Sequence, residues 1–202
     1  MFAQTQNELH NMKHMSILAV SLLALVACTP EKKQEADYSQ YVNPMIGTDF
    51  TGNTYPGAQV PFGMVQLSPD NGLPGWDRIS GYFYPDTTIA GFSHTHLSGT
   101  GAGDLYDISF MPVTRPYKEA PAPLGIYSTF SHNDEAASAG YYRVLLKDYN
   151  INVELTATER CGIQRYTFPE AEASVFLNLK KAMNWDFTLR SEERRVGKEG
   201  GC

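Results

Sequence analysis

The sequence predicts an all-β fold, a twisted antiparallel β-sandwich, because short apolar runs are separated by turn residues about every ten residues. In the second half of the chain Ile151, Val153 and Leu155 alternate with polar neighbours, which is the period of a half-buried strand. No strand alternates with a long helical pattern, so a parallel sheet is not expected. The 17 Gly and 12 Pro residues are spread as turn formers through the middle of the chain.

The expected elements follow from the same signals. Strands are predicted over 60–67, 79–84, 87–93, 106–113, 141–147, 151–159, 162–168 and 173–180. In the last of these, Val175 and Leu177 share one face. Residues 68–72, with Pro, Asp, Asn and Gly, predict a turn, and residues 148–150 predict a hairpin turn. Ser131 is placed to cap one short helical turn.

The composition excludes two broad classes of protein. Sixteen Lys and Arg stand against 22 Asp and Glu, and the net charge is -6. A dedicated nucleic-acid binder needs clustered basic residues, so no nucleic acid is expected as a partner. Aromatic residues make up 12% and charged residues 19%, which excludes a wholly disordered chain.

The N-terminal region predicts export. Residues 17–27 form an apolar run of signal-peptide length after Lys13. The run ends in Leu25–Cys28, which resembles a bacterial lipobox, so residues 1–28 are interpreted as a lipoprotein signal peptide and Cys28 as the lipidated residue. An ordinary signal peptide with an incidental Cys is the alternative. Residues 29–40 are polar and predict a tether to a bacterial membrane, at its periplasmic face or at the cell surface.

The predicted sandwich covers residues 41–190. Residues 191–202 lack apolar periodicity and are interpreted as a non-native tail, with a genuine solvated tail as the alternative. Apart from Cys28 and Cys202, only Cys161 remains, so no internal disulfide framework is expected.

Two loops carry groups that suit a sugar ligand. Asn53 and Tyr55 lie in a Gly- and Pro-rich segment that supplies hydrogen-bonding groups. Trp76, Asp77 and Arg78 place an indole beside a carboxylate and a guanidinium. The indole can stack on the CH face of a sugar while its charged neighbours bind hydroxyl groups.

A third segment contains His94 and His96 and ends at Asp104. On a strand the two His residues face the same way, which also suits a metal, but the spacing indicates no third ligand. Substrate contact and a structural role inside a packed loop are the other interpretations. The Gly run at 99, 101 and 103 lacks the Lys and hydroxyl of a phosphate-binding loop.

Loop acids could form a catalytic carboxylate pair, although each on its own is typical of a turn. These acids are Asp70, Asp77, Asp86, Asp104 and Asp107. No nucleophile elbow of the G-x-S-x-G type occurs, so nucleophilic catalysis has no support.

Several of these segments together resemble glycoside hydrolase family 92, whose members are exo-acting α-mannosidases. The matching segments are Tyr41–Thr48, Asn53–Ala58, Pro61–Met64, Gly91–Gly101, Gly140–Val144 and Glu154–Arg160. The resemblance implies an N-terminal β-sandwich that packs on a larger (α/α)6 barrel, and a calcium-dependent hydrolysis of terminal α-mannosides with inversion. It also implies that the acid, the base and the calcium ligands lie mainly in the barrel, and that loops of the sandwich complete the mannose pocket.

On this resemblance we expect a fragment that contacts mannose-containing glycans and is inactive alone. Its substrate contacts would be Asn53, Tyr55, His94, His96 and Asp104, with Trp76, Asp77 and Arg78 added on chemical grounds. The face that meets the barrel should be apolar around Phe62, Trp76 and Phe92. The alternative is a stand-alone carbohydrate-binding surface lipoprotein without catalysis.

Overall fold

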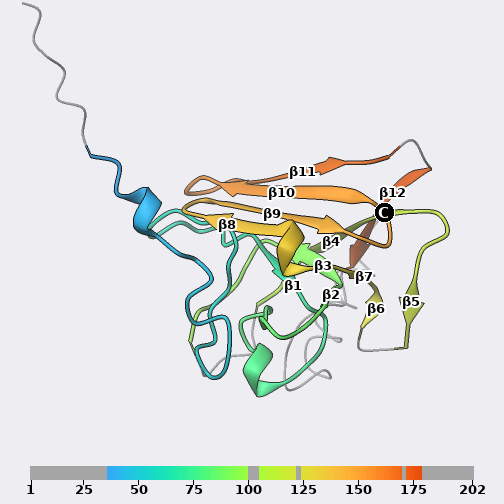
Figure 1. Ribbon diagram of the computed structural model, residues 1–202, viewed down its shortest axis with the longest axis horizontal. Helices are drawn as coiled ribbons and strands as arrows, with labels where there is room; N and C mark the ends of the chain where they lie inside the picture. Colours follow the sequence, from blue (N-terminus) through green and yellow to red (C-terminus); the bar gives the residue numbers. More distant parts are fainter. Residues whose placement is uncertain (1–35, 100–104, 122–123, 170–171, 179–202) are drawn as a thin grey trace, which may run out of the picture. The chain divides into compact units, whose positions relative to one another are not determined.

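Two four-stranded antiparallel sheets form the framework of the protein (Figure 1). The structure, a computed structural model, describes residues 36–99, 105–121, 124–169 and 172–178. The first sheet has the order β1-β3-β4-β12, formed by β1 (Ser68–Asp70), β3 (Gly91–Ser93), β4 (Ser109–Thr114) and β12 (Ala173–Asn178). The second has the order β11-β10-β9-β8, formed by β8 (Glu135–Ser138), β9 (Tyr141–Leu146), β10 (Ile151–Ala157) and β11 (Gly162–Thr167). The predicted all-β antiparallel class is confirmed.

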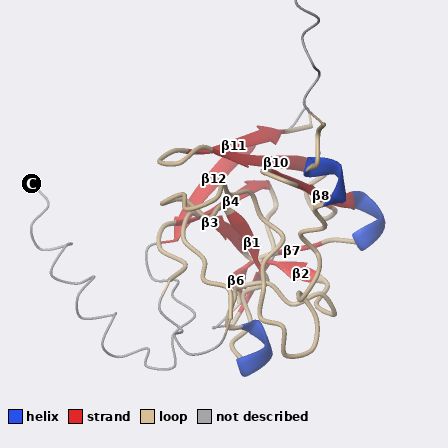
Figure 2. Ribbon diagram, turned by 90° about the vertical axis from the view of Figure 1, so that its left-hand side faces the viewer, coloured by secondary structure: helices blue, strands red, loops and turns tan. Residues whose placement is uncertain are grey.

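Smaller elements complete the described fold. Strand β2 (Thr88–Ile89) pairs with β7 (Ser128–Thr129), and β5 (Glu119–Ala120) pairs with β6 (Gly125–Ile126). The 3-10 helices η1 (Ser39–Tyr41), η2 (Trp76–Arg78) and η3 (His132–Asp134) lie outside the sheets in Figure 2. Within the described residues, no helix is long and apolar enough to span a membrane.

The chain divides into two units, Met1–Asp37 and Tyr38–Cys202, and the fold described here belongs to the second. The predicted signal peptide with Cys28, the tether up to residue 35 and the predicted tail lie outside the described residues. The boundaries proposed for these segments therefore stay predictions.

The second sheet follows the predicted pattern closely. Strands β9 and β10 form a hairpin in register from Ile151 opposite Leu146 to Thr156 opposite Tyr141. The alternating residues of β10 are buried, because every second side chain faces the core. The Ser131 hydroxyl accepts a hydrogen bond from the backbone N–H of Asn133 at 3.3 Å and caps η3, as predicted.

Both sheets contribute to one hydrophobic core. Its fully buried side chains include Leu67, Phe92 and Val113 beside the first sheet or within it, and Tyr142, Val144, Leu146, Ile151, Val153 and Leu155 in the second. Burial of each large apolar side chain contributes about 1.5–3 kcal/mol, so this shared core holds the sheets together.

The first sheet departs from the sequence-based prediction at β1. Residues 68–72 were expected to turn, yet Ser68–Asp70 forms a buried strand paired with β3. The Asp70 carboxylate meets the His96 ring at 2.9 Å. A tertiary partner therefore overrides the local turn preference of the Pro-Asp-Asn-Gly sequence.

Three further predicted strands change in the structure. Residues 79–84 form turns and loops, and the backbone of Gly81 has a φ of +88°. The predicted strand 87–93 is divided into β2 and β3. Residues 60–67 form a turn followed by a single bridge between Ala58 and Leu67.

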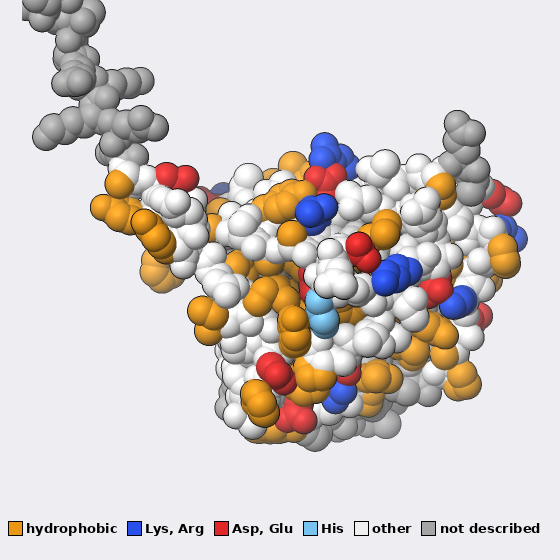
Figure 3. Space-filling view, in the orientation of Figure 1, with side chains coloured by type: hydrophobic (Ala, Val, Ile, Leu, Met, Phe, Trp, Pro, Cys, Tyr) orange, Lys and Arg blue, Asp and Glu red, His pale blue; other side chains and the backbone are white. Residues whose placement is uncertain are grey.

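The exposed apolar surface differs from the predicted patch in one member. Phe62 is fully exposed and Trp76 is 47% exposed, but Phe92 is completely buried in the core. Phe92 lies on β3 and pairs with Phe110 of β4, so it belongs to the interior of the sandwich. Hydrophobic side chains gather instead over η1 and the loop after it (Figure 3), where Tyr38, Tyr41, Val42 and Ile46 are exposed.

Candidate functional site

Two hydrogen bonds join three of the predicted site segments along one border, which we call the loop border. The N–H of Gly99 donates to the carbonyl of Asn53 at 2.7 Å. The hydroxyl of Ser80, just after η2, donates to the carbonyl of Thr54 at 2.9 Å. The loop carrying Asn53 therefore lies beside the end of the His96 segment and beside the residues that follow η2.

Asn53 occupies an unusual position in this border. Its φ is +49°, a left-handed conformation that Asn tolerates better than most residues. The side-chain amide donates to the carbonyl of Thr51 at 3.3 Å, while the buried Oδ1 atom has no hydrogen-bond partner. A buried acceptor without a hydrogen-bond partner lowers the stability of the fold, so a ligand group that donates a hydrogen bond to this oxygen would gain binding free energy.

Tyr55 is held beneath the same loop. Its hydroxyl donates to Oε1 of Gln59 at 2.6 Å, and its ring lies 5.1 Å from the His96 ring. Burial raises the pKa of Tyr55 to about 12, although a hydrogen bond with Ser98 acts in the opposite direction. Tyr55 is therefore neutral at physiological pH and links the Asn53 and Ser98 segments.

His96 is fully enclosed by protein. Its Nδ1 atom lies 2.7 Å from the Gln66 carbonyl and its Nε2 atom lies 2.9 Å from Oδ1 of Asp70. Both side chains of this pair have no exposed surface. The Asp70 carboxylate also accepts hydrogen bonds from the hydroxyls of Ser93 and Ser109, which tie β1, β3 and β4 together. In this arrangement His96 supports the fold beneath the border.

His94 lies in a different environment from His96. Its ring contacts Phe110 edge to face at 5.6 Å. Burial lowers its pKa, against a hydrogen bond with the backbone of Ile108. A side-chain Cβ built at Gly162 would lie 3.0 Å from the His94 ring, so His94 packs beside β11. The two His rings have different partners, and the described residues contain no group of three or more metal-ligating side chains.

The loop at η2 contains one exposed aromatic ring, Trp76, and one Arg, Arg78, that forms an ion pair with Asp86. Trp76 is nearly half exposed. Arg78 binds Asp86 through two hydrogen bonds of 2.6 and 2.5 Å and lies over the Phe83 ring at 4.7 Å. The hydrogen bonds that the guanidinium donates to Asp86 raise the pKa of Arg78, and the charge of Asp77 adds to this effect. Arg78 therefore holds in place the loop that carries Trp76 and Asp77. The remaining predicted site residue, Asp104, lies outside the described residues.

A second cluster, around Glu135, was missed at the sequence level. The Glu135 carboxylate is almost completely buried and accepts hydrogen bonds from the hydroxyls of Tyr82 at 3.0 Å and Tyr142 at 2.5 Å. It also meets Nδ1 of His132 at 2.7 Å. Burial and the nearby carboxylate raise the pKa of both Tyr hydroxyls. The spacing of His132 and Glu135 by three residues was the available signal, but it pointed to a helix cap.

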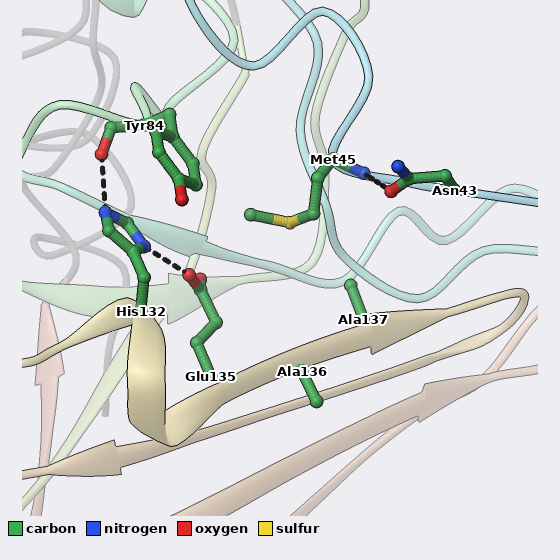
Figure 4. A pocket seen from close by; sticks show the side chains of 7 residues that line it. All are labelled: Asn43, Met45, Tyr84, His132, Glu135, Ala136 and Ala137. Carbon is green, nitrogen blue, oxygen red and sulfur yellow. Dashed lines mark hydrogen bonds and ion pairs between the residues drawn. The ribbon is translucent and has the colours of Figure 1, made fainter.

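This cluster forms one wall of a pocket of about 240 Å³ (Figure 4). The His132 ring stacks on Tyr84 at 3.9 Å and 9°, and its Nε2 atom donates to the Tyr84 carbonyl at 2.7 Å. Figure 4 shows Met45 facing the Tyr84 ring, with Ala136 and Ala137 on β8 below them. Asn43 completes the lining. The pocket therefore has the stacked rings of Tyr84 and His132 on one side and β8, the last strand in the order of its sheet, on another.

Comparison with known proteins identifies relatives over most of the chain. Residues 41–200 match the family described as "Glycosyl hydrolase family 92 N-terminal domain", a range that extends into the predicted tail. A family GH92 α-mannosidase of Bacteroides thetaiotaomicron, solved with mannoimidazole, is 44% identical over 72% of this chain and 20% of its own, with a TM-score of 0.68. An inverting GH92 mannosidase of the same organism is 31% identical over 71% of this chain and 20% of its own, with a TM-score of 0.57.

A more distant relative comes from a fungus. A protein of Arthroderma benhamiae described as an uncharacterized secreted glycosidase is 26% identical over 80% of this chain and 21% of its own length. The chain therefore spans about a fifth of the length of the relatives it matches.

Proposed function

Since the chain belongs to glycosyl hydrolase family 92, through the N-terminal domain of that family, we propose that it forms the sandwich of an exo-acting α-mannosidase. The observation that carries this proposal is the 44% identity with a GH92 α-mannosidase over 72% of the chain. The described border would supply part of a mannose pocket, and the acid and the base would come from a barrel domain. Inversion would then proceed with one group protonating the leaving oxygen and another activating water on the opposite face of the sugar.

Two places along the border formed by the Asn53, Trp76 and Gly99 loops suit contact with a sugar. Trp76 offers an exposed indole on which the CH face of a pyranose can stack, and Asp77 lies beside it to accept hydrogen bonds from hydroxyl groups. The unpartnered Oδ1 of Asn53 would accept a hydroxyl group if the loop around it shifts. The polar atoms of His96 and Arg78 already bind protein partners. These two side chains would therefore support the sugar-contacting residues without touching the sugar themselves.

Calcium dependence is part of the proposal, with the ligands outside the described residues. Calcium takes six to eight oxygen ligands, and the described residues bring no three metal-ligating side chains together. The described carboxylates of Asp70, Asp86 and Glu135 are instead held by protein partners. In this proposal no step of the reaction involves calcium bound by the described residues.

Calorimetric titration with methyl α-mannoside tests whether the border contacts mannose. We expect weak binding by the full chain, and we expect Trp76→Ala to weaken it roughly fivefold or more, since aromatic contacts contribute about 1 kcal/mol beyond area. Tyr117→Ala is the matched control, because Tyr117 is also an exposed ring but contacts Phe176 of β12. Equal binding by both variants would contradict a sugar contact at Trp76.

Export of the protein is also proposed, with a lipid anchor at Cys28. The secreted fungal relative supports export, and the lipobox-like Leu25–Cys28 supports the anchor. Metabolic labelling with a fatty acid in a bacterial host should mark the wild-type chain and leave Cys28→Ser unlabelled. If Cys28→Ser is still labelled, the lipid is attached to another residue and the proposed anchor at Cys28 is refuted.

A further inference from the structure

Residues 80–84 link the loop border to the second sheet, although they belong to no strand. We call this segment the strap, and only Ile79 separates it from η2. A segment outside a sheet has no ladder of backbone hydrogen bonds, so individual contacts determine where it lies. The backbone N–H of Asn71, just after β1, donates to the carbonyl of Gly81 at 2.8 Å and holds the middle of the strap. Further contacts join the strap to the Asn53 loop and to the cluster around Glu135.

Two hydrogen bonds join the strap to the loop that carries Asn53. The Ser80 hydroxyl donates to the carbonyl of Thr54 at 2.9 Å. The backbone N–H of Tyr84 donates to the carbonyl of Thr48 at 2.8 Å. Because Thr48 and Thr54 lie on either side of Asn53 in the sequence, these bonds fix both ends of its loop. The position of the unpartnered Oδ1 atom of Asn53 therefore depends on where the strap lies.

Two other contacts join the strap to Glu135 on β8. The Tyr82 hydroxyl donates to the Glu135 carboxylate and lies 3.0 Å from each of its oxygens. The Tyr84 carbonyl accepts a hydrogen bond from Nε2 of His132 at 2.7 Å, and Nδ1 of the same ring meets Glu135 at 2.7 Å. Tyr82 is buried and the Glu135 side chain is 2% exposed. Since a hydrogen bond to an ionised carboxylate is about twice as strong as one between neutral groups, Glu135 is the point at which the second sheet holds the strap.

We propose that Glu135 is a positioning residue for the loop border and that it acts on the border through the strap. Its carboxylate holds Tyr82 and His132, and the strap holds both ends of the Asn53 loop. Protein donors already occupy the Glu135 oxygens, so its effect on a ligand is indirect. Residues that contact a ligand bind it more tightly when the groups behind them are rigid. The effect on sugar binding rests on the proposed function, whereas the hold on the border does not.

Amide exchange of the full chain tests whether the second sheet holds the border. Tyr82→Phe removes the hydroxyl at the end of the strap and keeps the buried ring. The amides of Thr54 and Gly99, which donate hydrogen bonds within the border, should exchange roughly two- to thirtyfold faster in this variant, after correction for the change in global stability measured at the amides of β10. Tyr141→Phe is the matched control and should leave both amides unchanged, because its hydroxyl donates to Glu154 at 2.6 Å on the other face of the same sheet. Equal exchange in the wild type and in Tyr82→Phe would overturn the proposal.

Calorimetric titration with methyl α-mannoside tests the effect on sugar binding. We expect Tyr82→Phe and Glu135→Gln each to weaken binding roughly two- to thirtyfold, and Tyr141→Phe to leave it unchanged. Ser80→Ala breaks the other end of the strap, and a strap detached at one end no longer transmits a change at the other. The variant with both Tyr82→Phe and Ser80→Ala should therefore bind no more weakly than the weaker of the two single variants. Additive losses of affinity would overturn the proposal.

The two measurements separate this proposal from the proposed function. If the wild-type chain does not bind the sugar, the proposed function fails, and exchange at Thr54 and Gly99 alone decides whether Glu135 holds the border. If exchange at these amides becomes faster in Tyr82→Phe while its affinity for the sugar equals that of the wild type, the positioning role in sugar binding is overturned.

Discussion

The pair formed by His96 and Asp70 shows how a residue in a distinctive motif can serve the fold. Both side chains are completely buried, and both ring nitrogens of His96 face oxygen acceptors. When one partner of a buried pair is removed, the other is left without compensation, at a cost of about 3–5 kcal/mol. The position of the loop after His96 therefore depends on an interaction inside the fold.

Replacing Asp70 tests this dependence. We expect Asp70→Asn to lower the free energy of unfolding by about 3 kcal/mol or more, measured by urea denaturation. Asp134→Asn is the control, because Asp134 pairs with Lys147 at 3.6 Å on the surface, where loss of a pair costs about 1 kcal/mol or less. If both variants are equally stable, the buried pair contributes little and His96 is free for another role.

Gly81 makes a second prediction for a single residue. Its φ is +88°, and a Cβ atom there would lie 2.6 Å from the Tyr106 ring and 3.0 Å from both Asp70 and His96. Gly125 has a similar φ of +67° but nothing within 4 Å of the same position. Gly125→Ala should therefore cost about 1–2 kcal/mol from backbone strain alone. Gly81→Ala should cost about 1–3 kcal/mol more from overpacking. Thermal unfolding of the two variants separates these costs, and equal melting temperatures would contradict the close packing around Gly81.

At the level of elements, the β9–β10 turn is fixed to β7 by one carboxylate. Asp148 accepts hydrogen bonds from the backbone N–H of Thr129 at 2.6 Å and from Lys118 Nζ at 2.5 Å. Burial alone would raise the pKa of Asp148, but these hydrogen bonds outweigh it and lower the pKa below the ordinary value of 3.8. Because the folded pKa is the lower one, the stabilisation is complete above the unfolded value and is lost as the pH falls through the folded pKa.

Urea denaturation at several pH values tests this account. As the pH falls from about 5 through 3.8 to about 2, the wild-type chain should lose more stability than Asp148→Asn, since the variant has no carboxylate to protonate. Glu159→Gln, at an exposed position after β10, should follow the wild-type curve. A parallel loss of stability in the wild type and in Asp148→Asn would show that Asp148 does not carry this part of the acid sensitivity.

The elements also show where sequence reasoning succeeds and where it fails. The hairpin of β9 and β10 was predictable because alternation and a local turn specify it within twenty residues. Strand β1 was not, because its partners β3 and His96 lie more than twenty residues away and its own residues favour a turn. Among the site residues, a structural role for His96 inside a packed loop was one of the interpretations from the sequence, whereas the Glu135 cluster includes the hydroxyl of Tyr82, which lies far away in the sequence and which no local pattern connects to Glu135.

At the scale of the whole domain, three buried carboxylates of the described residues are held by protein partners. An inverting glycosidase needs two carboxyl groups about 6.5–9.5 Å apart, one free to donate a proton and one free to activate water. Asp70 is bound by His96, Asp86 by Arg78, and Glu135 by Tyr82 and Tyr142. These carboxylates are committed to the fold, which fits a domain that supports a pocket whose reacting groups lie elsewhere.

We accordingly expect the full chain to bind methyl α-mannoside but to release little or no mannose from an α-linked mannobiose, with or without added calcium. Chromatography of the released sugar measures this directly, and a GH92 α-mannosidase of full length serves as the positive control. Asp77 is the described carboxylate that lies beside the exposed Trp76, so Asp77→Ala is the decisive variant. Mannose release by the wild-type chain that disappears in Asp77→Ala would place catalysis inside this domain and refute the division of labour between a contacting sandwich and a reacting barrel. If the chain binds the sugar without releasing mannose, with or without calcium, the result fits both a detached enzyme domain and a carbohydrate-binding lipoprotein. The coding DNA downstream then decides between them: an uninterrupted reading frame that encodes a helical barrel favours the enzyme.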